Sequence, residues 1–182
     1  MKVYFNLPPL PEQPDVLLVQ PPLEYGPCLA GTGETLGLEL LATILRQRGY
    51  TVKILDTFLL NMELDQIVAA MVRYCPKKLL GFSIHVMDMF PRVQEILAQL
   101  PANFHSILTV AGGHAPTFWY HHILENCRQI DVVARVEGEG AILDLMESVE
   151  GKTALKDIEG IVYRTPDGHS QLTAPRSLLP DL

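Results

Sequence analysis

From residue 15 onward, apolar residues alternate between two kinds of run. Short continuous apolar runs recur at Val16–Gln20, Val52–Leu55, Leu79–Ser83, Ile107–Ala111 and Val132–Val136. A continuous run of this length is typical of a strand that is buried on both faces, as in a parallel sheet covered by helices. The pattern therefore predicts five parallel strands.

Between these runs, apolar residues follow the three- and four-residue spacing of helices. The predicted helical positions are Leu36, Leu40, Leu41, Ile44 and Leu45, closed by Gly49; Leu64, Ile67, Val68, Met71 and Val72; Val93, Ile96, Leu97 and Leu100; Phe118–Asn126; and Ile142, Leu145, Met146 and Val149. Five strand–helix units predict an α/β fold: a doubly wound, flavodoxin-like or Rossmann-like, five-stranded parallel sheet with right-handed crossovers. An antiparallel α+β fold is the less favoured alternative.

The pattern divides the chain into three segments. Residues 1–14 hold four prolines and predict an irregular lead-in, and residues 15–150 carry the strand–helix units. Residues 151–182 contain two short apolar runs around a Pro-Asp-Gly turn, which predicts a β-hairpin. The last residues, Ala174–Leu182, include two prolines and no periodicity, so we expect a linker there.

Composition narrows the class of protein. The 182 residues are 48% hydrophobic and carry a net charge of −7 with no basic cluster, which disfavours a nucleic-acid partner. Three widely spaced cysteines form no CxxC pair, which fits a reducing cytoplasmic location and gives a zinc site little support. No apolar run approaches the ~20 residues of a membrane span. We expect a cytoplasmic protein without a membrane partner.

Glycines open two of the predicted strand-to-helix junctions. Leu108–Thr117 reads LTVAGGHAPT and Ala134–Gly140 reads ARVEGEG. In an open parallel sheet these junctions lie at the carboxyl edge, where such folds bind ligands. His85, after the third strand, is either a ligand contact or a loop histidine without a ligand. His114, after the double glycine, is either a ligand contact or the cap of the following helix. Glu137 and its neighbours also fit simple stabilisation of a helix N-terminus.

A third glycine-containing stretch, GTGETLG at residues 31–37, imitates a dinucleotide fingerprint. That fingerprint needs its first glycine directly after the strand, so that the helix N-terminus meets the pyrophosphate. Here Pro21 and Pro22 end the strand, and further residues intervene before Gly31. We therefore favour a long loop, Pro21–Thr35, over a nicotinamide site. A phospho-acceptor receiver domain is also disfavoured, because Gln20–Pro22 and Ser83 stand where its acidic residues belong.

The segments together resemble the N-terminal cobalamin-binding domain of the cobalamin-dependent radical SAM enzymes. The matching pieces, in order, are VLLVQPP, LGLELLATILRQRGYTVKILD, LLGFSIHV, VAGGHAPTF, IDVVARVEGEG and the hairpin IEGIVYRTPDG. The resemblance implies a cobalamin lying on the carboxyl edge of the sheet, with its nucleotide tail between the glycine-opened loops. The cofactor-binding residues that it implies are Leu23, Glu24, Tyr25, Gly33, Thr35, Leu36, Ser83, His85, Val86, Gly112, Gly113, His114, Glu137 and Gly138.

Two departures from related families shape the expected function. The first loop lacks the histidine of the DxHxxG signature, so the resemblance implies base-off cobalamin; the lower cobalt ligand is unknown, with water, Tyr25 or Cys28 as candidates. The chain also lacks CxxxCxxC, so SAM and an iron–sulfur cluster belong to a missing or partner domain.

The expected function is to position a corrinoid for methyl transfer or a related radical reaction, with a radical SAM domain in cis or in trans. The protein itself supplies no catalytic residue in this reading. One alternative is a stand-alone cobalamin carrier or sensor without catalytic activity. A weaker alternative is a nucleotide-dependent enzyme that uses the GTGETLG loop.

Overall fold

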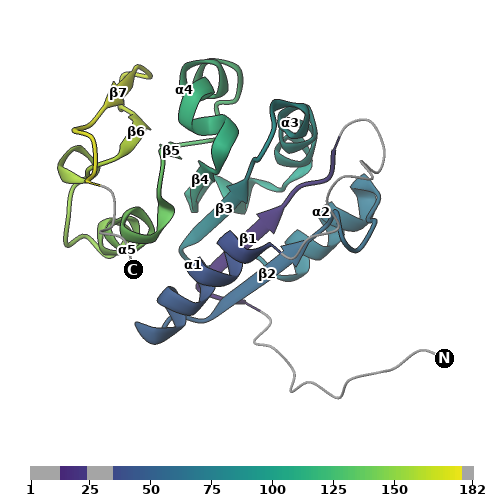
Figure 1. The fold of residues 1–182 in the computed structure, drawn as a ribbon. Helices are drawn as coiled ribbons and strands as arrows, with labels where there is room; N and C mark the ends of the chain where they lie inside the picture. The colour runs from purple at the N-terminus through teal and green to yellow at the C-terminus, as the bar shows by residue number, and fades with distance from the viewer. Residues whose placement is uncertain (1–12, 24–34, 178–182) are drawn as a thin grey trace.

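The computed structural model describes residues 13–23 and 35–177, and within them one sheet forms the centre of the molecule (Figure 1). Its seven strands lie in the order β2-β1-β3-β4-β5-β6-β7. The first five are parallel: β1 (Val16–Gln20), β2 (Val52–Asp56), β3 (Leu79–Ser83), β4 (Leu108–Gly112) and β5 (Val132–Ala134). The predicted parallel sheet is therefore confirmed.

The predicted hairpin is also present, and it extends the same sheet. Its strands are β6 (Ile161–Arg164) and β7 (Ser170–Leu172), and β6 pairs antiparallel with β5. Because β7 runs antiparallel to β6, it runs in the same direction as β5. The end of β7 therefore lies at the edge of the sheet where the five parallel strands have their carboxyl ends.

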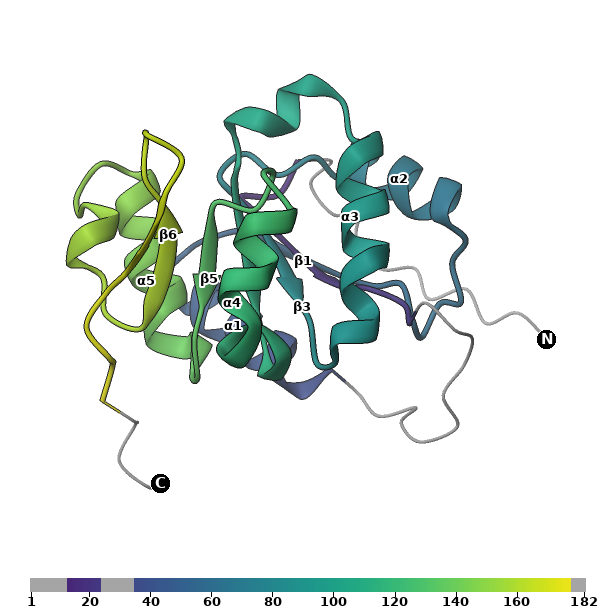
Figure 2. The ribbon, with the colours of Figure 1, turned by 90° about the horizontal axis from the view of Figure 1, so that it is seen from above.

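Helices cover both faces of the sheet (Figure 2). One face packs against α1 (Leu36–Gln47) and α5 (Gly138–Val149), which also contact each other. The other face packs against α2 (Leu64–Arg73), α3 (Phe90–Gln99) and α4 (His114–Asn126). Short 3₁₀ turns occupy Met87–Met89, Ala102–Ser106 and Leu155–Asp157. No helix in these described ranges is long and apolar enough to cross a membrane.

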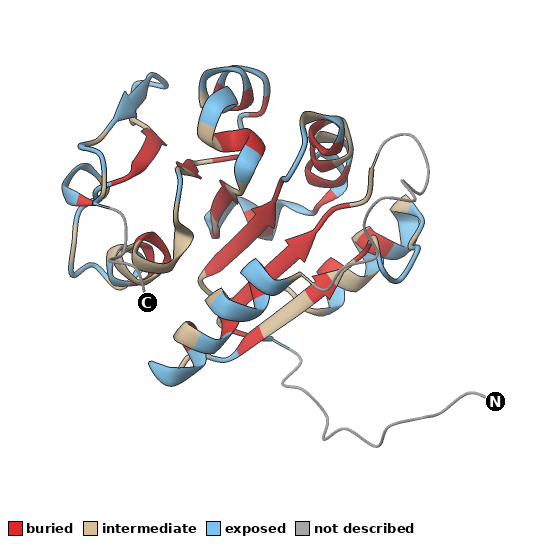
Figure 3. Ribbon diagram, in the orientation of Figure 1, coloured by how far each residue is buried: buried red, intermediate tan, exposed pale blue. Residues whose placement is uncertain are grey.

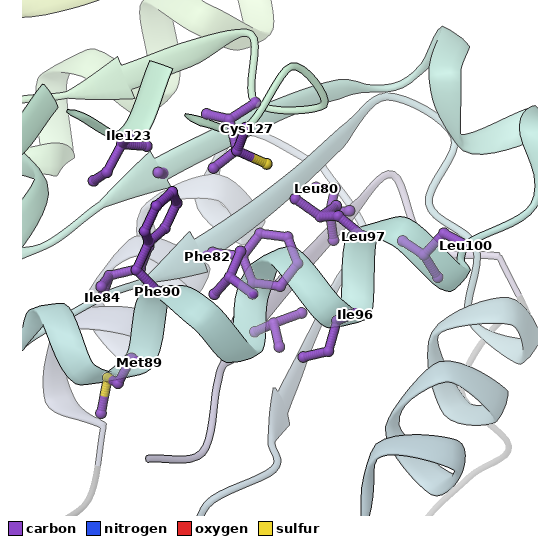
Figure 4. Packing of buried hydrophobic residues seen from close by; sticks show 14 of the residues in the cluster. Leu80, Phe82, Ile84, Met89, Phe90, Ile96, Leu97, Leu100, Ile123 and Cys127 are labelled. Atoms are coloured by element: carbon purple, nitrogen blue, oxygen red, sulfur yellow. The ribbon is translucent and has the colours of Figure 1, made fainter. Parts of the chain in front are cut away.

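The central strands β1 and β3 are buried along their whole length, as the apolar runs predict (Figure 3). Successive strand residues face opposite sides, so Leu80 and Phe82 enter the cluster beneath α3 while Leu79 enters the cluster beneath α1 and α5. Figure 4 shows Phe82 in the first of these clusters with Phe90 and Ile96. Each such side chain contributes roughly 1.5–3 kcal/mol on burial.

The predicted buried face of α1 was wrong in part. The buried face of α1 is Leu38, Ala42 and Leu45, whereas the predicted Leu36 and Leu40 are exposed. The four-residue spacing was right, but it began at the wrong leucine: Leu36 is the first helical residue and is 68% exposed, whereas Leu38 is buried.

The ends of two other elements also differ from the expectation. β5 stops at Ala134, before Val136, because Val136 has a φ of +65° and its N–H bonds to Thr117 Oγ1. α4 begins at His114, well before Phe118, because the turn is completed at Gly113 with a φ of +107°.

An ionic cluster ties α1, β3 and α5 together at the amino edge of the sheet. Glu150, at the end of α5, accepts hydrogen bonds at Oε1 from Tyr50 Oη (3.0 Å) and Lys78 Nζ (2.6 Å), and at Oε2 from Lys152 Nζ (2.7 Å). The bonds from Lys152, Lys78 and Tyr50 lower the pKa of Glu150 from its ordinary value to about 2. A lowered pKa means that the carboxylate stabilises the fold above its unfolded pKa.

Replacing Glu150 with Gln should lower the urea midpoint of unfolding at pH 7. The loss should shrink as pH falls from about 4.5 towards about 2, because in that window the wild-type carboxylate loses its stabilising charge. Urea titrations across this pH range check the expectation. Glu147→Gln, an exposed change on the same helix, serves as the control and should show no comparable pH-dependent loss. A Glu150→Gln deficit that stays constant with pH would contradict the assignment.

Candidate functional site

A cavity of about 250 Å³ opens between the sheet and helices α1 and α5, at the carboxyl ends of the strands. The sheet contributes Leu18, Gly81, Phe82, Ser83, Val110, Gly112 and Ala134. The two helices contribute Gly37, Leu38, Leu41, Gly138, Glu139, Ile142 and Leu145, and the connecting loops contribute His85, Gly113, Val136 and Glu137. The cavity therefore lies at the edge where the glycine-opened junctions were expected to meet.

The cavity exists because the strands carry small residues where they face α1 and α5. On β3 these are Gly81 and Ser83, two residues apart and so on the same face. Gly81 lies beside Leu18 of β1 and Val110 of β4, and Ser83 lies beside Gly112. A Cβ atom at Gly81 would come within 2.9 Å of Leu18 Cδ2. The leucine thus leans over the glycine and forms part of the floor.

Glycines also occupy the first turns of both helices that form the opposite wall. A Cβ atom at Gly37 of α1 would meet nothing within 4 Å, and one at Gly138 of α5 would lie 3.4 Å from Leu41 Cδ2. Both helices begin at the carboxyl edge, so their first-turn N–H groups, which lack intrahelical acceptors, lie at the mouth. The helix dipoles make this mouth favourable for negative charge.

The polar side chains gather near the mouth rather than along the floor. Ser83 Oγ, at the end of β3, lies 3.4 Å from His85 Nε2. Ser83 is buried, whereas His85 is exposed. Glu137 is the N-cap residue of α5, and Glu139 follows within its first turn. These groups present hydrogen-bonding atoms to an occupant only at its outer end.

The loops after β3 and β4 cross closely beside the cavity. A Cβ atom at Gly113 would lie 2.8 Å from the carbonyl oxygen of Ile84. The Ile84 N–H donates to the Gly112 carbonyl, and the Ile84 carbonyl accepts from the Ala115 N–H. Gly113 is therefore required by the backbone itself, independently of any occupant, whereas Gly112 has room for a Cβ atom.

The C-terminal segment packs against α5 on the side of the hairpin. Arg176 forms an ion pair with Asp144, and its Nη1 atom would lie 2.5 Å from a Cβ atom at Gly140. A Cβ atom at Gly160 would lie 3.0 Å from the Cβ atom of the same arginine. The Gly160 N–H also donates to the Ala174 carbonyl. Two glycines thus make room for one arginine side chain.

The structure brings six of the expected site residues together around the cavity: Ser83, His85, Gly112, Gly113, Glu137 and Gly138. Thr35, Leu36, Val86 and His114 are outside the lining, and Leu23 packs with the α2–α4 core cluster. His114 is exposed at the start of α4, with its ring 5.2 Å from that of Phe118. Glu24, Tyr25, Gly33 and Cys28 lie outside the described residues.

Sequence reasoning missed Gly81 and Leu18 on the floor and the part of the helical wall that α1 contributes. Gly81 was absorbed into an apolar strand, although a glycine two residues before a serine was a signal that small residues share one strand face. Leu38 was missed because the wrong helical face was chosen, whereas Leu41 was placed on the packed face of the helix but not recognised as part of a site. No group of three or more His, Cys, Asp or Glu residues in the described ranges is placed to hold a metal ion.

A family model described as the B12 binding domain matches residues 25–146. The chain belongs to the B12-binding domain family. The match includes both helical walls, both glycine-opened junctions and the floor residues other than Leu18 of β1. The resemblance drawn from the sequence, to the cobalamin-binding domains of cobalamin-dependent radical SAM enzymes, is thereby confirmed.

Two curated relatives match most of this chain at similar sequence identity. The anaerobic magnesium-protoporphyrin IX monomethyl ester cyclase of Synechocystis sp. is 29% identical over 147 residues, which cover 81% of this chain and 29% of the cyclase. The hopanoid C-3 methylase of Methylococcus capsulatus is 26% identical over 136 residues, covering 74% of this chain and 26% of the methylase. The chain thus spans less than a third of the length of either relative.

Solved structures of B12-dependent enzymes share the fold of this family member. The cobalamin-dependent S-adenosylmethionine radical enzyme OxsB, with aqua-cobalamin and S-adenosylmethionine bound, has a TM-score of 0.71 at 19% identity and matches 92% of this chain and 23% of OxsB. The radical S-adenosylmethionine methyltransferase TsrM from Kitasatospora setae, with cobalamin and a [4Fe-4S] cluster bound, has a TM-score of 0.69 at 19% identity, covering 91% of this chain and 30% of TsrM.

Gly113→Ala should destabilise the protein by about 1–3 kcal/mol, because the new methyl group meets the Ile84 carbonyl and φ is +107°. Gly37→Ala is the matched control. Its methyl group meets nothing within 4 Å, and alanine favours the helix by roughly 0.5–1 kcal/mol. Urea unfolding of both variants checks the contrast. Equal stability of the two would show that the crossing of the loops after β3 and β4 is not tight.

Proposed function

We propose that this chain binds cobalamin and positions the corrinoid for methyl transfer or a related radical reaction, together with a radical SAM domain in the same chain or in a partner. The observation that carries the proposal is the cavity between the sheet and helices α1 and α5, floored by Gly81 and opening at the carboxyl edge. In this proposal residues 1–14 form a lead-in, residues 15–150 the cofactor domain, and residues 151–182 a hairpin and linker.

The size and lining of the cavity fit one part of a large cofactor. Its volume of about 250 Å³ is below the ~300–1,000 Å³ of a pocket that encloses a drug-sized ligand. A whole corrinoid is far larger, so only its slender nucleotide tail can enter while the flat ring stays outside. The apolar floor suits the tail's bicyclic base, and the helix N-termini at the mouth suit its phosphate.

The proposed roles follow from position. Gly81, Ser83 and Gly112 leave the space that the base occupies, while His85 and Glu137 face the part of the tail that emerges. The first loop, with Leu23, Glu24, Tyr25 and Gly33, would approach the corrin, together with Thr35, Leu36, Val86 and His114. When bound, the cobalt supplies a carrier for the methyl group. The protein contributes binding, orientation and control of access.

The partnership with a radical SAM domain is supported by the relatives and by their lengths. The hopanoid C-3 methylase and the magnesium-protoporphyrin cyclase are about three to four times as long as the regions that match this chain. SAM and the iron–sulfur cluster would be held by such a second domain. This chain would then provide the cofactor and no catalytic residue of its own.

The purified chain, mixed with hydroxocobalamin and passed through gel filtration, should elute with the corrinoid. The visible spectrum of that fraction should be of the base-off type, because the cavity removes the base from the cobalt. Absorption at neutral pH is the measurement, with NADH and NADPH as comparison ligands. Complete separation of corrinoid from protein would overturn the proposal, and retention of a nicotinamide instead would favour a nucleotide-dependent function.

A graded series at Gly112 tests whether the cavity is the binding site. A Cβ atom at Gly112 would meet only Ala134 Cβ, at 3.8 Å, so Gly112→Ala should fold normally and bind slightly more weakly. Gly112→Val extends into the cavity and should weaken cobalamin binding by about tenfold or more, equivalent to ~1.4 kcal/mol. Dissociation constants and unfolding midpoints of both variants are the measurements. Undiminished binding by Gly112→Val would place the cofactor elsewhere.

A further inference from the structure

The inner wall of the cavity is apolar, whereas the polar side chains of its lining stand at the mouth. Leu18, Leu38, Val110 and Leu145 form this wall, and all four are buried. The polar side chains among the described lining residues stand at strand ends, in the following loop or at the start of α5: Ser83, His85, Glu137 and Glu139. The inner end of an occupant therefore meets hydrocarbon.

The backbone around this wall offers no hydrogen-bond acceptor to compensate. β3 lies between β1 and β4, and both ladders are complete through Gly81, so its peptide groups are engaged on both sides. Within α1 and α5 the carbonyl groups are taken up by the helical hydrogen bonds. The free backbone groups are first-turn N–H groups at the mouth, and these are donors.

From this asymmetry we propose that the cavity discriminates between cobamides by their lower base, accepting dimethylbenzimidazole and disfavouring adenine. The inference rests on the proposed function, because it assigns the cavity to the nucleotide tail. Dimethylbenzimidazole ends in a benzo ring with two methyl groups, which gain from burial against the leucines and valine. Adenine ends in an amino group and ring nitrogens, which must leave water without finding partners.

The size of the discrimination follows from that missing partner. Burial of a polar group without a hydrogen bond is costly, and a site that leaves such a group unpaired selects strongly against it. We expect the adeninyl cobamide to bind about tenfold or more weakly than cobalamin. Substitution of Val110 by threonine can alter the selectivity between the two bases with little change in side-chain shape, because threonine replaces one methyl group of valine with a hydroxyl.

The experiment is equilibrium dialysis of the whole chain against three cyano-corrinoids: cobalamin, the adeninyl cobamide, and cobinamide, which has no nucleotide. Cobalamin should bind most tightly and cobinamide should bind weakly. Equal dissociation constants for cobalamin and the adeninyl form, or tighter binding of the adeninyl form, would overturn the selectivity while leaving the proposed function standing. If none of the three is retained, the proposed function itself fails.

Two isosteric variants locate the effect. Val110→Thr puts a hydroxyl acceptor on the inner wall and should narrow the ratio of the two cobamide dissociation constants by several-fold. Val16→Thr is the matched control: Val16 is buried in the same core cluster but does not line the cavity, so the ratio should be unchanged. Because each ratio is measured within one variant, a general loss of stability cancels. A ratio that Val110→Thr leaves unaltered would refute the assignment of selection to this wall.

Discussion

The apolar packing of α1 and α5 against the sheet stops short of the carboxyl ends of the strands, and the site depends on that incomplete packing. At the amino half, Val16, Leu79 and Val132 fill the space beneath the helices. One row further along, Gly81 presents no side chain, and Leu18 leans into the gap. Protein interiors are otherwise close-packed, so an unfilled volume of this size is a specific consequence of these residues.

The two edges of the same helix pair are built in opposite ways. At the amino edge, Glu150 accepts hydrogen bonds from Tyr50 after α1, from Lys78 before β3 and from Lys152 after α5. At the carboxyl edge, glycines begin both helical walls and the polar groups stand around an opening. The side chains that join the elements at the amino edge have no counterpart at the carboxyl edge, where the described lining residues leave an opening.

The sequence was sufficient for the order of the elements and for the junctions that glycine opens, because those signals are local. Gly112, Gly113 and Gly138 interrupt apolar runs and are visible without a structure. Gly81 does not interrupt its strand, and its importance comes from Leu18 on a neighbouring strand. The face of α1 was misjudged for a related reason: Leu36 and Leu38 are equally apolar, and only the position of the helix relative to the sheet edge distinguishes them.

The arginine between two glycines links the cavity wall to the C-terminal segment. Arg176 is held by Asp144 of α5 and lies against Gly140 on that helix and Gly160 beside β6. Gly140 lies in the same first turn of α5 as Gly138, which lines the cavity. One turn of α5 thus serves two neighbours, the cavity on one side and Arg176 on the other. The position of the backbone that leaves β7 is therefore set by the same helical turn that borders the cavity.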